Sequence, residues 1–70
     1  MSVYLLVQAI KDLSKVAERV ESLSNDYEFD TAEYYDDPYV KDQRDRFSAA
    51  LSEIIKAKES LNSVLDNMKE

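Results

Sequence analysis

Apolar residues recur in this chain at alternating intervals of three and four, over two separate arms. In the first arm they are Val3, Leu6, Ile10, Leu13, Ala17 and Val20, and in the second they are Phe47, Ala50, Ile54, Ala57, Leu61, Val64 and Met68. This alternation is the a/d pattern of a heptad, which places an apolar stripe along one side of an α-helix. The chain has no glycine and one proline, which disfavours β-hairpin turns and phosphate-binding loops. The pattern therefore predicts an all-α protein with two helical arms.

The first predicted helix is bounded by short polar residues. Ser2 can cap its start, because a serine hydroxyl accepts a hydrogen bond from an unpaired amide of the first turn. Ser24, Asn25 and Asp26 are expected to end it, because their side chains compete for backbone hydrogen bonds. We therefore predict a first helix over about residues 3–24.

The second predicted helix begins at a well-defined signal. Asp37 is a favoured N-cap, and Pro38 suits the first helical position, where its missing N–H costs nothing. We predict a second helix over about residues 38–68 and a connection over 25–37. At about 1.5 Å per residue the second helix is longer by roughly 13 Å, so the aromatic residues of the connection are expected to cover its first turns.

The apolar face of each arm is wider than a contact between two helices requires. The residues that flank the two stripes are Val7, Ala9, Val16, Leu23, Leu51, Ile55 and Leu65. Two packed helices bury a narrow seam, so the flanking residues need a further neighbour. Seventy residues without cysteine also form a small core that no disulfide reinforces, and oligomerisation is a usual source of the missing stability.

These features predict one domain, residues 1–70, folded as an antiparallel helical hairpin that dimerises into a coiled-coil-like four-helix bundle. The partner in this assembly is a second copy of the chain, as a homodimer or a higher homo-oligomer. The residues expected to form the oligomer core are Leu6, Ile10, Leu13, Val20, Phe47, Leu51, Ile54, Leu61 and Leu65.

The net charge of −6 resides in a single stretch, residues 25–39. This stretch contains six carboxylates and neither Lys nor Arg, whereas the acids and bases of the remaining chain balance. It also contains five of the seven aromatic residues. The candidate partner-binding residues are therefore Asp26, Tyr27, Glu28, Phe29, Asp30, Glu33, Tyr34, Tyr35, Asp36, Asp37 and Tyr39.

Several interpretations of this acidic, aromatic connection stay open. Tyrosine is enriched at interfaces and carboxylates steer encounter, which favours a protein partner with a basic surface. Alternatively, the tyrosines pack on the second helix and the acids keep the protein soluble. A small acidic inhibitor, such as a phage-type accessory protein, could also occupy a nucleic-acid-binding protein by mimicking nucleic acid. Mimics usually spread acids over much of their surface, however, and here the arms are balanced.

The residue types that are absent argue against catalysis. Without His or Cys the chain lacks the usual general base near neutral pH and the softer metal ligands. Two acidic pairs, Glu18 with Glu21 and Asp42 with Asp45, faintly resemble the magnesium-holding pairs of all-helical nucleotide pyrophosphohydrolases, but their heptad positions face outward. The connection also has Thr31 where an EF-hand loop needs glycine. We expect no catalytic residue, cofactor or metal.

The acidic balance disfavours direct binding to nucleic acid or to an anionic membrane, since both would repel the chain. The apolar run 1–10 is ended by Lys11 and Asp12 after too few residues for a membrane span or a typical signal peptide. We therefore expect a cytoplasmic, non-enzymatic, oligomeric protein-interaction or assembly module whose acidic connection contacts a partner protein.

Overall fold

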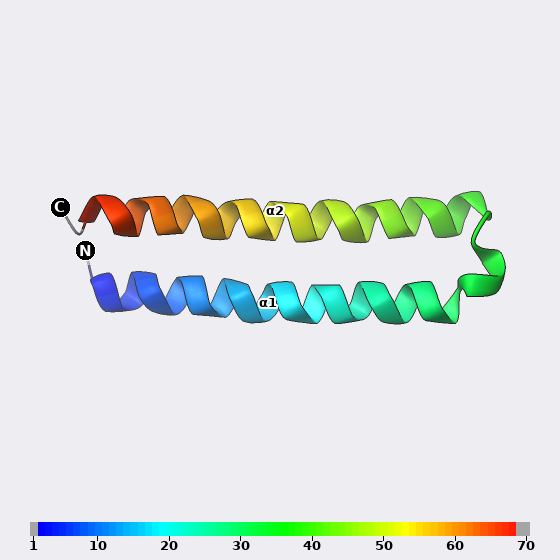
Figure 1. The fold of residues 1–70 in the computed structure, drawn as a ribbon, viewed down its shortest axis with the longest axis horizontal. Coiled ribbons are helices and arrows are strands. Elements are labelled where there is room, and N and C mark those ends of the chain that lie inside the picture. Colours follow the sequence, from blue (N-terminus) through cyan, green and yellow to red (C-terminus); the bar gives the residue numbers. More distant parts are fainter. Residues whose placement is uncertain (1, 69–70) are drawn as a thin grey trace.

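Two antiparallel α-helices lie side by side along the whole length of the computed structural model (Figure 1). The structure describes residues 2–68. Helix α1 spans Val3–Asp30 and α2 spans Pro38–Met68, and a short 3-10 helix, η1, lies between them at Ala32–Tyr34. The Cα atoms extend over 52 × 15 × 13 Å, so the molecule is a short rod with the turn at one end. The prediction of an all-α helical hairpin is confirmed.

Both helices begin at the capping residues that the sequence indicated. Ser2 Oγ accepts a hydrogen bond from the amide of Leu5 at 3.3 Å. Asp37 Oδ1 accepts hydrogen bonds from the amides of Tyr39 at 2.8 Å and Val40 at 3.3 Å. These bonds satisfy amides that have no carbonyl partner within the first helical turn, and a cap of this kind typically contributes about 1 kcal/mol. The predicted bounds of the second helix agree with those of α2.

The predicted end of the first helix is wrong, because α1 continues through residues 24–26 to Asp30. The inward positions continue at the same spacing to Tyr27, whose ring packs against that of Phe47 with centroids 5.6 Å apart. Helix propensity differs by only about 0.7 kcal/mol among ordinary residues, so tertiary packing of this kind outweighs the preference of Ser, Asn and Asp for helix ends.

The connection is correspondingly shorter than predicted. It comprises residues 31–37 rather than 25–37, and η1 occupies its first half. Thr31 closes α1, because its backbone N–H and its hydroxyl both donate to the carbonyl of Tyr27. With 28 and 31 residues, α1 and α2 nearly match in length, so the unpaired first turns expected for the second helix do not occur.

The seam of α1 follows the predicted stripe, whereas the seam of α2 does not. A continuous row of buried or half-buried residues runs along α2 at intervals of four and three: Val40, Arg44, Phe47, Leu51, Ile54, Lys58, Leu61, Leu65 and Met68. Ala57 and Val64, which the spacing placed in the stripe, are exposed instead, as is Val3 at the start of α1.

The choice of seam in α2 follows from side-chain size. The row through Phe47, Ile54 and Leu61 has two possible neighbours on the helix surface. One is Ala50, Ala57 and Val64, and the other is Leu51, Lys58 and Leu65. Leucine buries more apolar area than alanine, and each additional buried methylene contributes about 0.8 kcal/mol. The helix therefore turns its leucines inward and accepts Lys58 between them, since a lysine stem can lie along apolar surface with its ammonium in water.

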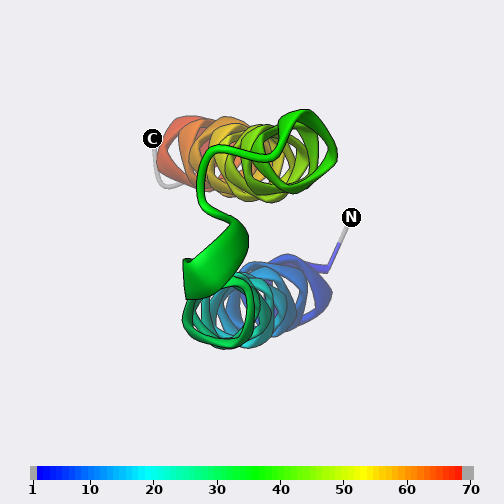
Figure 2. The ribbon, with the colours of Figure 1, turned by 90° about the vertical axis from the view of Figure 1, so that its right-hand side faces the viewer.

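The core of the single hairpin is thin. Among the described residues only Leu6 and Val40 are buried, at 8% and 7% exposure. Viewed end-on, the described residues form two helices joined by the turn, and no further element packs against either flank of the pair (Figure 2). The other residues of the seam consequently stay half-buried.

Candidate protein-interaction surface

The six carboxylates of residues 25–39 gather at the turn end of the rod, which we call the acidic tip. The tip is formed by the last turns of α1, by η1 and by the start of α2. All six of its acidic residues are exposed. Among residues 2–68 the recorded ion pair involves none of them, so their charge faces solvent.

Four of the five aromatic side chains of the tip are exposed. Phe29 is 84% exposed, and Tyr34, Tyr35 and Tyr39 are 60%, 64% and 69% exposed. Tyr27 is half-buried and belongs to the seam through its contact with Phe47. Exposed single apolar residues are common on soluble proteins, but a cluster at one end of a molecule is the pattern of a contact surface.

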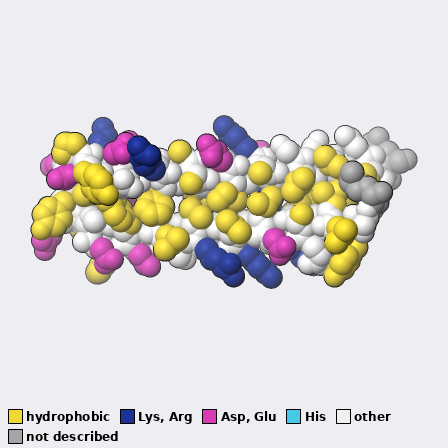
Figure 3. All heavy atoms as spheres, turned by 180° about the vertical axis from the view of Figure 1, so that it is seen from behind, with side chains coloured by type: hydrophobic (Ala, Val, Ile, Leu, Met, Phe, Trp, Pro, Cys, Tyr) yellow, Lys and Arg dark blue, Asp and Glu magenta, His cyan; other side chains and the backbone are white. Residues whose placement is uncertain are grey.

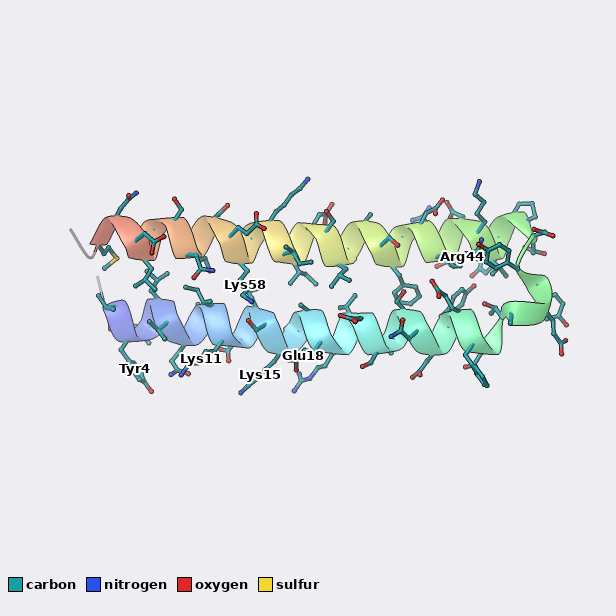
Figure 4. The ribbon with its side chains drawn as sticks, in the orientation of Figure 1. Tyr4, Lys11, Lys15, Glu18, Arg44 and Lys58 are labelled. Atoms are coloured by element: carbon teal, nitrogen blue, oxygen red, sulfur yellow. The ribbon has the colours of Figure 1, made fainter. Side chains whose placement is uncertain are left out.

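Arg44 of α2 holds the turn in place. Its guanidinium carbon lies 3.9 Å from the centre of the Tyr35 ring, and its Nη1 donates a hydrogen bond to the Tyr35 carbonyl at 2.9 Å. Figure 4 shows Arg44 at the turn end of α2. Sequence reasoning missed this contact, because the two residues are nine positions apart and meet only through the shape of the turn. Tyr35 remains 64% exposed but is engaged by Arg44, whereas Phe29, Tyr34 and Tyr39 take part in no recorded ring contact among the described residues.

A second arginine is paired along α2. Arg46 Nε donates a hydrogen bond to Asp42 Oδ2 at 2.8 Å, in the i,i+4 spacing that brings two helical side chains together. This hydrogen bond and the charge of Asp42 raise the pKa of Arg46 above its ordinary value. Both side chains are well exposed, so the pair orients Arg46 on the surface and adds little to stability.

The nine residues predicted for the oligomer core all lie in the seam of the hairpin itself. Leu6 is buried and the other eight are half-buried, and they face one another across the two helices of one chain. Contact with a second copy stays a prediction. The large apolar residues left exposed on the helices beyond the seam include Val16, Leu23, Ile55 and Val64.

A shallow groove runs between the helices on one side of the rod. Its walls carry Glu18 and Glu21 from α1 and Ile55, Lys58 and Glu59 from α2. Lys58 reaches from α2 toward α1 across this groove (Figure 4). The acidic pair Asp42 and Asp45 is not part of the groove, so the two acidic pairs do not converge. Within the described residues, no group of three or more carboxylates is placed to hold a metal ion.

Comparison of the chain with protein-family models, with curated proteins and with solved structures gives no match. Neither described helix contains a stretch that is both long and apolar enough to cross a bilayer.

Proposed function

We propose that this protein is a non-enzymatic, self-associating interaction module whose acidic tip contacts a partner protein with a basic surface. The observation that carries the proposal is the exposure of Phe29, Tyr34 and Tyr39 among six exposed acidic residues at one end of the rod. Negative charge and exposed aromatic area thus occur together at one end of the hairpin.

The two kinds of side chain have different roles in this contact. The carboxylates attract a basic surface and raise the association rate above the ~10⁵–10⁶ M⁻¹s⁻¹ of an unsteered encounter. The aromatic rings provide the area that is desolvated after docking, and truncation of one anchoring ring typically costs about 2 kcal/mol or more. Arg44 keeps the turn between them ordered, so little freedom is lost on binding.

Self-association is supported by the thin core. A hairpin in which only Leu6 and Val40 are buried, among the described residues, gains little from burial. A second copy would cover seam residues that one hairpin leaves half-exposed. Stability then depends on protein concentration by mass action, so the melting temperature should fall on a hundredfold dilution. A stable 8.1 kDa monomer with an unchanged melting temperature would contradict this part of the proposal.

The lack of enzymatic function is supported by the residue types and by their placement. The chain has no His, Cys or Gly, and the acidic residues of the groove lie beside Lys58 rather than beside the second acidic pair. Incubation with nucleoside triphosphates and Mg²⁺ or Mn²⁺ should give no turnover. Hydrolysis that disappears in Glu18→Ala or Glu21→Ala would contradict this.

The partner contact is tested by capture from the native host with matched variants. Phe29→Ser, Tyr34→Ser and Tyr39→Ser together should abolish capture of a specific protein, which is then purified and titrated directly. Tyr4→Ser is the control, because Tyr4 is 69% exposed at the opposite end of the rod. Equal affinity of the triple variant and the control for the purified partner would refute the role of the tip.

The same surface supports a second candidate, a small acidic inhibitor of a nucleic-acid-binding protein. The observation that favours it is that none of the six tip carboxylates takes part in the ion pair recorded among residues 2–68. Competition separates the two candidates. If the captured protein binds nucleic acid, and if DNA or RNA displaces the hairpin from it, the inhibitor function is favoured over an assembly module.

A further inference from the structure

The two flanks of the hairpin differ in character. On one flank, successive heptads of α1 and α2 carry small and medium apolar residues, which we call the apolar flank: Ala9, Val16, Leu23, Ala50, Ala57 and Val64. Val16, Leu23 and Val64 are 39%, 57% and 39% exposed. Figure 3 shows hydrophobic side chains gathered along the line between the helices, with charged side chains along the margins. The opposite flank carries the shallow groove described above, with Lys58, Glu18, Glu21 and Glu59 in its walls.

Residues on the apolar flank alternate in size at each level along the rod. The contact of Tyr27 with Phe47 sets the register of the antiparallel helices. Because the helices are antiparallel, a step back along α1 matches a step forward along α2. Starting from this contact, Leu23 therefore lies at the same height along the rod as Ala50. Steps of seven residues give the next two pairs, Val16 with Ala57 and Ala9 with Val64. Each level therefore holds one larger and one smaller side chain.

The charged margins of the apolar flank are also matched in level. Arg19 and Asp26 lie on the α1 margin, and Glu53 and Arg46 lie on the α2 margin. The same register sets Arg19 level with Glu53 and Asp26 level with Arg46, to within about 3 Å along the rod. Within one chain these residues cannot meet, because the width of both helices separates the two margins.

We propose that a second copy of this chain docks on the apolar flank, with the two rods parallel and related by a two-fold axis along their length. This inference rests on the self-association proposed above and specifies its geometry. The axis brings α1 of one copy against α2 of the other, so the larger residue at each level meets the partner's smaller residue. Arg19 then faces Glu53 of the partner subunit, and Asp26 faces Arg46 of the partner subunit.

Area and charge both support this occupant. Contact along the whole face of 52 by 15 Å would cover a projected area of roughly 800 Å², close to the ~800 Å² that each partner contributes to a standard interface, with the apolar flank forming about 21 Å of its length. A C2 axis requires a self-complementary patch, and this flank is self-complementary in size and in charge. In this dimer Arg46 keeps its ion pair with Asp42 and also faces Asp26 of the partner subunit, so it lies between two carboxylates.

The parallel arrangement places both acidic tips at the same end of the dimer. A basic partner that contacts one tip then has the second tip within reach, which raises the effective concentration of the second contact. Repulsion between the tips is limited at physiological salt, where charges interact over only about 8 Å.

Charge reversal on the two margins tests the pairing. Arg19→Glu faces Glu53 of the partner subunit with a like charge, and Glu53→Arg faces Arg19 of the partner subunit in the same way. Each single variant meets this repulsion twice in its homodimer, so its dissociation constant should rise about tenfold. Mixing the two single variants restores both opposite-charge pairs, so native mass spectrometry should show the heterodimer in excess of the statistical half. The controls are Lys15→Glu and Asp45→Arg, which make the same charge changes away from the apolar flank.

Orientation is tested with a spin label, since the chain has no cysteine. Ala32→Cys places one label in η1 of each copy, on an exposed residue. The parallel dimer predicts a label separation of about half the 52 Å rod length or less by pulsed electron paramagnetic resonance. A separation near the full length would mean an antiparallel dimer, and it would overturn the proposed geometry.

Failure of this inference is distinguishable from failure of the proposed function. A statistical mixture of single variants that still dimerise would overturn the apolar flank as the interface and leave self-association standing. A wild-type protein that is monomeric at every concentration would overturn both. Variant folding is checked by circular dichroism, and the exposed positions chosen here should preserve the helical signal of the wild-type chain.

Discussion

Replacement of Lys58 by leucine tests which face of α2 forms the seam. Lys58 is half-buried in the row that contains Leu51 and Leu65. A leucine there would continue the apolar row toward α1. Full burial of a leucine contributes about 1.5–3 kcal/mol, so a half-buried position should contribute roughly 1–1.5 kcal/mol. The variant also loses the attraction between the Lys58 ammonium and the nearby Glu18, Glu21 and Glu59. This loss reduces the gain by about 0.2–0.5 kcal/mol, because these groups are solvated.

The net expectation for Lys58→Leu is a gain of about 1 kcal/mol in the free energy of unfolding. For a chain of this size, 1 kcal/mol corresponds to about 4–8 °C in melting temperature. Thermal and urea unfolding followed by circular dichroism at one fixed protein concentration measures the change. Lys56→Leu is the matched control, because Lys56 is exposed on the same helix and leucine and lysine have similar helix propensities.

Two results would refute the reasoning. If Lys56→Leu stabilises as much as Lys58→Leu, the gain comes from general hydrophobicity and not from the seam. If Lys58→Leu has no effect while Ala57→Leu stabilises at all concentrations, the seam follows the a/d spacing that the sequence suggested.

Three further variants test the parts of the hairpin. Arg44→Gln removes the contact with Tyr35 and should cost about 1 kcal/mol, measured as a melting temperature lower by about 4–8 °C, whereas the exposed control Lys41→Gln should change it little. Asp37→Ala removes the N-cap of α2 and should cost about 1 kcal/mol in urea unfolding, clearly more than the neighbouring Asp36→Ala. Ile54→Asp places an unpaired charge in the seam and should abolish the helical circular dichroism signal, whereas Ile54→Val should cost only about 0.5–1.5 kcal/mol; a folded Ile54→Asp would contradict the seam.

Much of the hairpin could be predicted from local patterns. The 3-4 spacing of apolar residues depends only on helical geometry, so both helices and the α1 seam follow from it. The caps at Ser2 and Asp37 are contacts between residues two or three positions apart, which the sequence displays directly. The concentration of acids between residues 25 and 39 is likewise a property of the sequence.

The predicted end of the first helix and the predicted inward face of the second were wrong, because contacts between residues far apart in the sequence decide both. The polar run at 24–26 is compatible with either a helix end or a helix interior, and the contact of Tyr27 with Phe47 selects the interior. Contacts between distant residues also distinguish the tyrosines of the acidic tip. Tyr35 has the same local character as Tyr34, but only the Tyr35 ring is in contact with Arg44.

The sequence by itself determined that the chain is helical, where α2 begins, and that its excess negative charge lies around the turn. These features depend on periodicity, capping and composition, which act over a few residues. The tertiary structure decided the length of α1, the inward face of α2, and which aromatic rings near the turn contact α2. Those outcomes depend on competition between alternative packings. In α2, for example, Leu51 and Leu65 bury more area against α1 than Ala50, Ala57 and Val64 on the other side of the row can. Heptad spacing alone does not show which row of α2 buries more area, since both rows have the same spacing.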